Sequence, residues 1–290
     1  MNFELLKNEP MSEHTTFRTG GIAEEYYRIY NADGLMEVLE KCWNAGEEPL
    51  IIGNGSNLLI SDKGPGVPVI EIGEGLSSIV VDGDYIEAEA GVMLSKVARA
   101  ALDSSLTGME FASGIPGSVG GALYMNAGAY GGEMKDITES VKVYKDGIVI
   151  DIPAEEMKFG YRYSKAMDDH MIILGGRFKL EKGDRIEIED TMNDLNKRRR
   201  DKQPLEYPSA GSTFKRPEGY FAGKLIMDSG LAGKSVGGAV VSPKHCGFII
   251  NKGGATSTDI YNLICEVQDI VYKKYGVRLE TEVKLIGDFQ

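Results

Sequence analysis

Two glycine-rich segments constrain this chain more than any other feature of its sequence. The first, Gly53-Asn54-Gly55-Ser56-Asn57, follows the short apolar run 49–52, and the second runs from Gly114 to Gly121 and continues to Asn126-Ala127-Gly128. Glycine permits positive φ and close backbone approach, and serine and asparagine add short donors. Such segments suit phosphate oxygens, which need several convergent N–H groups. So much glycine is costly to order unless it binds something.

Neither segment matches the two commonest phosphate-binding motifs. No Gly-Lys-Ser/Thr follows either one, which excludes a Walker A loop. Gly53-x-Gly55 follows a predicted strand, but Asn57 and Leu58 stand where a Rossmann fingerprint has a glycine that opens a helix. On the residues alone, the alternative that both segments are only turns stays open.

Charge and cysteine usage narrow the class of protein. The net charge of −12 disfavours nucleic acid and anionic membranes as partners. The basic cluster at 197–202 is either a solvated helix face or a means of steering an anionic small molecule. Three cysteines without a C-x-x-C pair argue for a reducing compartment, hence the cytoplasm. His14, His170 and His245 show no metal spacing.

No targeting or membrane-spanning segment is expected. The first ten residues carry Glu4, Lys7 and Glu9 and lack an apolar stretch, which disfavours a signal peptide. The sequence contains no run of about 18 apolar residues, so no transmembrane helix is expected.

Hydrophobic periodicity predicts an α+β chain with mixed sheets, in three consecutive parts. Residues 1–73 are expected to form a helix, marked by Leu35, Val38, Leu39 and Cys42, followed by strands at 49–52 and 67–72. Residues 74–186 are expected to form hairpins over 79–88 and 141–152, a helix near 94–102 and a strand at 171–180.

The third part, residues 187–290, is expected to begin with a helix that ends before Pro204. A loop-rich stretch then reaches about Val241. Ser257 or Thr258 is expected to cap a last helix that Gly276 ends. The predicted final strand, 279–286, places Glu280 and Glu282 on one face.

Several segments, in chain order, resemble the motifs of the UDP-N-acetylenolpyruvoylglucosamine reductase family. The second glycine-rich segment is similar to that family's signature, and 53–59 is similar to its first flavin loop. The other matching segments are Thr15–Gly21, Phe159–Ser164, Ala210–Pro217 and Leu279–Val283. The resemblance extends from about His14 to Gly287, nearly the whole chain.

This resemblance implies an FAD-binding domain of the vanillyl-alcohol-oxidase type, with subdomains at 1–73 and 74–186. A smaller α+β substrate-binding domain with a C-terminal catalytic strand follows at 187–290. The implied reaction is the NADPH-dependent, FAD-mediated reduction of the enolpyruvyl group of a UDP-sugar to UDP-N-acetylmuramate, a peptidoglycan precursor. FAD would be held non-covalently. The short segment between Leu180 and Lys202 implies the shorter subtype, which lacks a tyrosine-bearing insertion.

The cofactor-binding residues that the resemblance implies belong to the N-terminal motif and the two glycine-rich segments. They are Arg18, Gly53, Asn54, Gly55, Ser56, Asn57, Gly114, Ile115, Pro116, Gly117, Ser118, Gly120, Gly121, Asn126, Ala127 and Gly128.

Three further residues are candidates for the chemistry. Hydride addition to an electron-rich enolpyruvyl bond needs a cation or acid at the attached carboxylate and a proton donor at the adjacent carbon. Arg162, whose planar fork matches a carboxylate, is the candidate clamp. Glu282 is the second carboxylate partner and Ser212 the proton donor, both selected by motif position. On local sequence alone, each also fits a purely structural role.

The substrate diphosphate requires cations and hydrogen-bond donors. The candidates are Tyr163, Lys202, Arg216 and Lys224, with Lys202 standing in an Arg-x-x-Lys-x-Pro arrangement from Arg199 to Pro204. Two alternatives to the reductase stay open: another FAD-dependent oxidase of the same fold, and a nucleotide-binding protein without catalysis. The sequence predicts no metal site and leaves the oligomeric state open.

Overall fold

The chain begins with two strands rather than with the helix expected first. The computed structural model describes residues 1–289, and its first elements are β1 (Phe3–Pro10) and β2 (Ile22–Ile29), joined through the short 3-10 turn η1 (Met11–Glu13). Neither strand shows clean alternation, because charged residues interrupt β1 and the adjacent Tyr26 and Tyr27 of β2 are both fully buried. A search for period-two hydrophobicity therefore misses them.

The described residues separate into two compact units, each built from non-consecutive segments. The first unit holds Met1–Leu5, Tyr27–Asn54 and Ile70–Arg199, and the second holds Leu6–Tyr26, Gly55–Val69 and the chain from Arg200 onward. The first glycine-rich segment is thus divided after Asn54. The three consecutive domains expected at 1–73, 74–186 and 187–290 stay a prediction.

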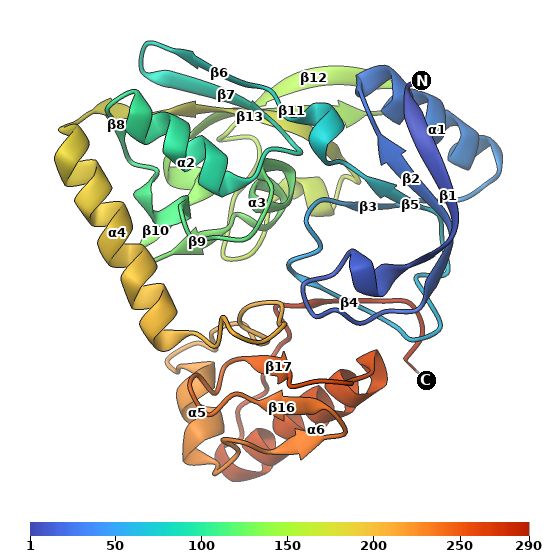
Figure 1. Cartoon of the computed structure of the whole chain (residues 1–290), viewed down its shortest axis with the longest axis vertical. Helices are drawn as coiled ribbons and strands as arrows, with labels where there is room; N and C mark the ends of the chain where they lie inside the picture. Colours follow the sequence, from blue (N-terminus) through green and yellow to red (C-terminus); the bar gives the residue numbers. More distant parts are fainter. Residues whose placement is uncertain (290) are drawn as a thin grey trace. The chain divides into compact units, whose positions relative to one another are not determined.

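A five-stranded antiparallel sheet of order β12-β11-β13-β7-β6 forms the centre of the first unit (Figure 1). Its strands are β6 (Ile79–Asp82), β7 (Tyr85–Glu89), β11 (Thr138–Lys145), β12 (Ile148–Pro153) and β13 (Ile172–Lys179). Both predicted hairpins are confirmed. Asp146 and Gly147 turn β11 into β12 with φ of 50° and 86°, as a two-residue hairpin loop requires.

Helices α2 (Leu94–Asp103) and α3 (Val119–Met125) pack on this sheet and complete its core. The predicted α2 positions Leu94, Val97 and Ala98 are buried there. The short elements of the unit are β8 (Leu106–Thr107), β9 (Gly128–Ala129), β10 (Gly132–Glu133), β14 (Glu181–Lys182), η2 (Glu74–Leu76), η3 (Glu110–Ala112), η4 (Met134–Asp136) and η5 (Lys165–Met167).

Helix α1 (Ala32–Asn44) confirms the first predicted helix, and its four marker residues are buried. Asn31 caps it by accepting the N–H of Gly34 at 2.9 Å. Strands β3 (Leu50–Ile52) and β5 (Val69–Glu71) join β1 and β2 in a four-stranded sheet of order β1-β2-β5-β3.

Helix α4 (Arg185–Lys202) is the long helix expected to end before Pro204. Ile188 is its one buried residue, so the helix presents charged side chains to solvent along most of its length. None of the described helices has the length and apolar composition needed to cross a membrane.

The second unit packs α5 (Ala222–Asp228) and α6 (Ser257–Tyr275) with a three-stranded antiparallel sheet (Figure 1). The sheet consists of β15 (Ser235–Val236), β16 (Ala239–Val241) and β17 (Ile249–Asn251). A separate parallel pair joins β4 (Leu58–Ile60) to β18 (Lys284–Ile286), which are more than 200 residues apart in the sequence. The inward face of α6 forms much of the core, through Ile260, Leu263, Ile264, Val267 and Val271.

Three expectations for this unit are corrected. The α6 cap is Thr256, which forms a capping box with Asp259, and not Ser257 or Thr258. The stretch expected to be loop-rich contains α5, β15 and β16. The final strand is only Lys284–Ile286, so Glu280 and Glu282 precede it, and alternation along a strand does not set their directions.

Candidate functional site

The two glycine-rich segments meet within the first unit. Nδ2 of Asn54 donates to the carbonyl oxygen of Pro116 at 2.6 Å. A Cβ at Gly53 would lie 2.2 Å from Oγ of Ser118, so only glycine allows this approach without displacing the serine. Residues predicted separately from each segment are therefore brought together.

The second segment leads directly into α3, which it holds against a neighbouring backbone. The N–H groups of Val119 and Gly120 donate to the carbonyl oxygens of Val92 (2.8 Å) and Ala90 (2.9 Å). A Cβ at Gly120 would come within 3.0 Å of that of Ala90, so protein packing alone accounts for this glycine. Gly121 is different, because it is exposed and its Cβ would meet no described atom nearer than 3.8 Å. Its surface is open to a ligand.

Arg199, near the end of α4, lies against the start of the second segment. A Cβ at Gly114 would lie 3.1 Å from Cδ of Arg199 and 2.7 Å from Oδ1 of Asn196. The guanidinium group is half-buried, burial lowers its pKa, and no carboxylate in residues 1–289 forms an ion pair with it. A half-buried cation without a counter-charge suits an anionic ligand, and a diphosphate-bearing cofactor such as FAD fits this requirement.

Sequence reasoning did not identify Arg199 in this role. The residue was named only as one member of the basic cluster at 197–202 and as the first residue of the Arg-x-x-Lys-x-Pro arrangement. The available signal was its position three residues before the end of α4, in a basic cluster whose half-buried member the sequence alone does not distinguish.

Asn126 is fully buried and takes a left-handed conformation with φ of 43°. Its Nδ2 donates to Oε2 of Glu133 (3.0 Å) and to the carbonyl oxygen of Gly160 (2.8 Å), while its Oδ1 accepts the N–H of Lys135 (2.9 Å). Because protein groups satisfy its side-chain amide, Asn126 holds the backbone of residues 126–128 against the turn that contains Gly160.

Two other predicted cofactor residues of this segment use backbone groups within the fold. The carbonyl oxygen of Gly117 accepts the N–H of Leu94 at 3.0 Å, and the N–H of Ala127 donates to Ala122 at 2.8 Å. The side chain of Ile115 packs against the core of the first unit.

Arg162 lies on the turn that Asn126 holds. Gly160 and Tyr163 exchange two backbone hydrogen bonds, of 3.0 and 3.3 Å, and Arg162 between them has a φ of 55°. Its guanidinium group donates to the carbonyl oxygen of Gly128 at 3.4 Å and lies 5.0 Å from the centroid of the Tyr161 ring. The structure thus places the predicted clamp beside the end of the second glycine-rich segment.

A carboxylate also belongs to this cluster. Hydrogen bonding from Lys135 lowers the pKa of Glu133, against burial that raises it, and Asn126 and the positive charge of Arg162 lower it further. Nζ of Lys135 lies 2.8 Å from the Glu133 carboxylate. Glu133 therefore stays ionised and balances part of the positive charge around Arg162.

Tyr163 is engaged elsewhere. Its hydroxyl donates to Oδ2 of Asp168 at 2.6 Å, and this hydrogen bond raises the pKa of Tyr163. To contact a substrate diphosphate, the hydroxyl would have to leave a carboxylate acceptor. Its assignment to the substrate stays a prediction.

In the second unit, the N-terminal motif packs against the other half of the first glycine-rich segment. A Cβ at Gly55, whose φ is 57°, would lie 1.9 Å from the carbonyl oxygen of His14, and the N–H of Thr16 donates to Gly55 at 3.3 Å. Arg18 is exposed on this motif with φ of 55°. The buried hydroxyl oxygens of Thr16 and Thr19 have no hydrogen-bond partner among the described residues. Ser56 is half-buried in the loop.

One chain of hydrogen bonds links this loop to Glu282 and to Thr213, the residue after Ser212, in the second unit. Nδ2 of Asn57 donates to the carbonyl oxygen of Glu282 at 3.1 Å, and the N–H of Glu282 donates to Thr213 at 2.9 Å. Ser212 directly precedes Thr213 and is half-buried. The structure therefore places Ser212 and Glu282 at the predicted cofactor loop, although the three segments are far apart in the sequence.

The predicted substrate cations of the second unit are exposed. Lys224 pairs with Asp228 on α5 at 2.8 Å, which raises the pKa of Lys224. Arg216 lies over the ring of Phe221, with Cζ 4.0 Å from its centroid. Lys202 is exposed at the end of α4. None of these three is placed at Ser212 by a described contact.

Lys284 is a cation that sequence reasoning missed. Burial lowers its pKa, and the positive charge of Lys215 lowers it further. Lys215 reaches Oε2 of Glu280 at 3.2 Å. Two lysines therefore lie near the segment that carries Glu282. Among residues 1–289, no three histidine, cysteine, aspartate or glutamate side chains are grouped as metal ligands would be.

Comparison with known proteins assigns a family to both parts of the chain. Residues 203–286 match the family described as UDP-N-acetylenolpyruvoylglucosamine reductase, C-terminal domain. Residues 26–152 match the family described as FAD binding domain. The mixed helix and strand content, with these two domain types, confirms the α+β fold expected from the sequence.

Individual relatives cover nearly the whole chain. The UDP-N-acetylenolpyruvoylglucosamine reductase of Agathobacter rectalis is 50% identical, over 98% of this chain and 95% of the relative. That of Caldanaerobacter subterraneus is 49% identical, over 98% and 94%. The crystal structure of the corresponding reductase from Thermus caldophilus superposes with a TM-score of 0.87 at 34% identity, over 98% of this chain and 100% of that one.

Proposed function

The chain belongs to the UDP-N-acetylenolpyruvoylglucosamine reductase family of FAD-dependent oxidoreductases, and on that premise we propose that it reduces the enolpyruvyl group of UDP-N-acetylglucosamine enolpyruvate with NADPH. The product would be UDP-N-acetylmuramate, a precursor of peptidoglycan. The single observation that supports the proposal is the contact chain from Asn57 to Glu282 to Thr213, in which the predicted cofactor loop bonds to the backbone of Glu282 and, through it, to the residue after Ser212.

Several groups of this chain are suited to hold FAD. In the first unit these are the meeting point of Gly53 and Ser118, the open surface of Gly121, and the cation Arg199, which has no ion-pair partner among residues 1–289. In the second unit they are the loop Gly55–Asn57 and the exposed Arg18. FAD held by these groups would supply the hydride chemistry, by accepting hydride from NADPH and passing it to the outer carbon of the enolpyruvyl group.

The residues proposed for catalysis act on the substrate's carboxylate and the carbon beside it. We assign Arg162 as the clamp, because its fixed fork can donate two hydrogen bonds to a carboxylate and stays charged. Glu282 is the second group at the carboxylate, where the protonated form would donate to charge that develops as hydride adds. Ser212 Oγ would deliver the proton to the adjacent carbon.

A serine hydroxyl is a weak acid and needs a nearby cation or a water chain for this task. Lys215 and Lys284 are the candidate cations, because Lys215 follows Ser212 by three residues and donates its backbone N–H to the carbonyl oxygen of Glu280 at 2.9 Å, and Lys284 follows Glu282 by two residues. Tyr163, Lys202, Arg216 and Lys224 remain the proposed contacts of the substrate diphosphate. The shorter family subtype and the cytoplasm remain proposals as well, the latter supported by three free cysteines.

Anaerobic half-reactions of the purified protein test the proposal. The protein should carry the visible absorbance of a flavin, NADPH should bleach it, and the enolpyruvyl UDP-sugar should restore it. UDP-N-acetylglucosamine, which lacks the enolpyruvyl group, is the control and should leave the flavin reduced. A colourless protein that gains no flavin on refolding with FAD contradicts the proposal, and so does equal re-oxidation by the control sugar.

A further inference from the structure

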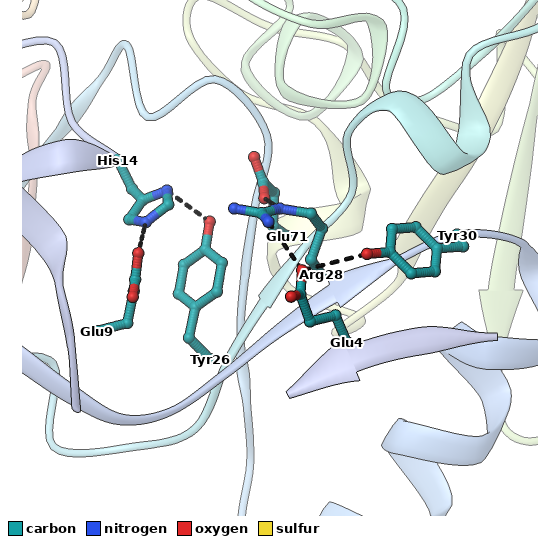
Figure 2. A network of polar contacts seen from close by, with 7 residues as sticks. All are labelled: Glu4, Glu9, His14, Tyr26, Arg28, Tyr30 and Glu71. Atoms are coloured by element: carbon teal, nitrogen blue, oxygen red, sulfur yellow. Dashed lines mark hydrogen bonds and ion pairs between the residues drawn. The ribbon is translucent and has the colours of Figure 1, made fainter. Parts of the chain in front are cut away.

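Three polar side chains form a network in the second unit that the proposed chemistry does not use. His14 lies between Glu9 and Tyr26 (Figure 2). Its Nε2 is 2.8 Å from Oε1 of Glu9, and its Nδ1 is 2.8 Å from the hydroxyl of Tyr26. The two rings also pack, with centroids 4.2 Å apart.

With a neutral imidazole, the network has one direction of donation. A tyrosine hydroxyl can donate to Nδ1, and Nε2–H can then donate to the carboxylate, so a neutral imidazole satisfies all three groups. Tyr26 is fully buried, and the His14 side chain is 11% exposed. Hydrogen bonds on both sides, to a buried tyrosine and to a partly exposed carboxylate, hold the imidazole ring in one orientation.

The backbone of His14 supports the loop Gly55–Asn57. Its carbonyl oxygen occupies the space where a side chain at position 55 would begin, 1.9 Å from an ideal Cβ. Two residues later, the N–H of Thr16 donates to the carbonyl oxygen of Gly55. A displacement of His14 would therefore displace the loop, because no side chain or gap lies between the two backbones.

We propose that His14, fixed by Glu9 and Tyr26, is a positioning residue that holds the cofactor loop in its FAD-binding conformation. This inference rests on the proposed function, since it takes Gly55–Asn57 as a flavin loop. The network of Glu9, His14 and Tyr26 lies outside the loop, and the affinity for FAD depends on its hydrogen bonds. Arg18, on the same backbone segment, is positioned by it as well.

A second network, of residues on or directly after β1, β2 and β5, provides a control in which the tyrosine is exposed. Arg28 on β2 contacts the carboxylates of Glu4 (2.9 Å) and Glu71 (3.3 Å), and the Tyr30 hydroxyl donates to Glu4 at 3.1 Å (Figure 2). This second network belongs to the first unit, and its members lie outside the His14–Thr19 segment and the cofactor loop. Tyr30→Phe removes one tyrosine hydroxyl bond, as Tyr26→Phe does.

The test compares FAD affinity in apoprotein variants with the thermal stability of the same apoproteins. His14→Ala should raise the Kd for FAD, followed by flavin fluorescence, about tenfold or more, as loss of a charge-linked hydrogen bond predicts. His14→Gln, which can still donate to Glu9, and Tyr26→Phe should each give a smaller loss. At saturating FAD, the visible circular dichroism of the bound flavin should differ between His14→Ala and the unaltered protein. If His14 only stabilised the fold, this spectrum would stay the same.

Tyr30→Phe should leave the Kd within about twofold of the unaltered protein. A His14→Ala protein that binds FAD as tightly as the unaltered protein overturns the inference and leaves the proposed function intact. Equal losses in Tyr26→Phe and Tyr30→Phe also overturn it. Tyr26→Phe keeps the aromatic ring and decides the question if His14→Ala does not fold. If the unaltered protein binds no FAD, the proposed function itself fails.

Discussion

Ser212 and Glu282 illustrate how single residues are placed by their neighbours. Thr213, between Ser212 and the core, donates its N–H to Gly247 at 2.8 Å and accepts the N–H of Ile249 through Oγ1 at 3.0 Å. Its carbonyl oxygen accepts the N–H of Glu282. These contacts hold the backbone without using the Ser212 hydroxyl, so removal of that hydroxyl should change chemistry and leave the fold unaltered.

Ser212→Ala tests the proton-donor role. The variant should retain FAD and be reduced by NADPH at the normal rate, while substrate turnover falls by about 10²–10⁴-fold, the usual contribution of general acid catalysis. Stopped-flow measurement of each half-reaction separates the two effects. Ser209→Ala, a nearby half-buried serine, is the control and should affect neither. Equal losses in both half-reactions would remove Ser212 from this role.

Arg162→Lys tests the clamp. A lysine replaces a planar fork by a point charge and loses the donor that reaches Gly128, so kcat/KM should fall about tenfold or more. Arg198→Lys is the matched control, since Arg198 is an exposed residue of α4 paired with Asp194. An unchanged kcat/KM in Arg162→Lys would contradict the clamp assignment.

At the scale of elements, α6 shows how a distant residue completes a helix. Asp62, which follows β4, accepts the N–H groups of Ser257 and Thr258 at 2.9 and 2.8 Å and the Thr258 hydroxyl at 2.6 Å. Burial raises the pKa of Asp62, but these hydrogen bonds lower it more, to below its usual value. A charged group at the positive end of a helix is also favourable.

Asp62→Asn should therefore reduce the free energy of unfolding near neutral pH, by about 1 kcal/mol as for loss of a helix cap. Because the folded pKa is depressed, the stabilisation is present above the unfolded value of about 4 and is lost as the pH falls through the folded value. Denaturant unfolding of both proteins between pH 7 and 3 measures this. A difference that persists unchanged at pH 3 would show that ionisation is not its source.

The close approach of the two glycine-rich segments at Gly53 and Ser118 is a second case in which two segments of the chain depend on each other. Gly53→Ala would force the Ser118 hydroxyl aside and should weaken FAD binding about tenfold. In a Ser118→Gly background, the same change should cost less, since the clashing atom is gone, and the two effects should be non-additive. Additive effects on the Kd would indicate that the two positions act independently.

For the whole molecule, cofactor binding and stability are linked. A ligand that binds only the folded chain stabilises it by about 2.7 kcal/mol at a hundred times its Kd. FAD should therefore raise the thermal midpoint of the apoprotein in a concentration-dependent way, and riboflavin, which lacks the diphosphate, should raise it much less. Equal shifts with both ligands would contradict a diphosphate-binding role for the glycine-rich segments.

The local sequence was sufficient to predict the helices and hairpins in which hydrophobic residues recur at regular spacing. Helices α1, α2 and α6 and the hairpins β6–β7 and β11–β12 follow from periodicity and turn residues, because burial of one face imposes that spacing. The ordered motifs identified the family and its FAD. Strands β1 and β2 lacked such a pattern, and their pairing could not be read from neighbours in the sequence.

The arrangement of the candidate site depended on contacts between distant segments. Sequence alone determined the glycine-rich segments and named Arg162, Ser212 and Glu282, since these are matters of residue type and order. Folding determined that Asn57 bonds to Glu282 and that the side-chain amide of Asn126 bonds to Glu133 and Gly160. Folding also determined that Arg199 is the half-buried member of a basic cluster. Backbone pairing and burial arise from non-local packing, which no local pattern encodes.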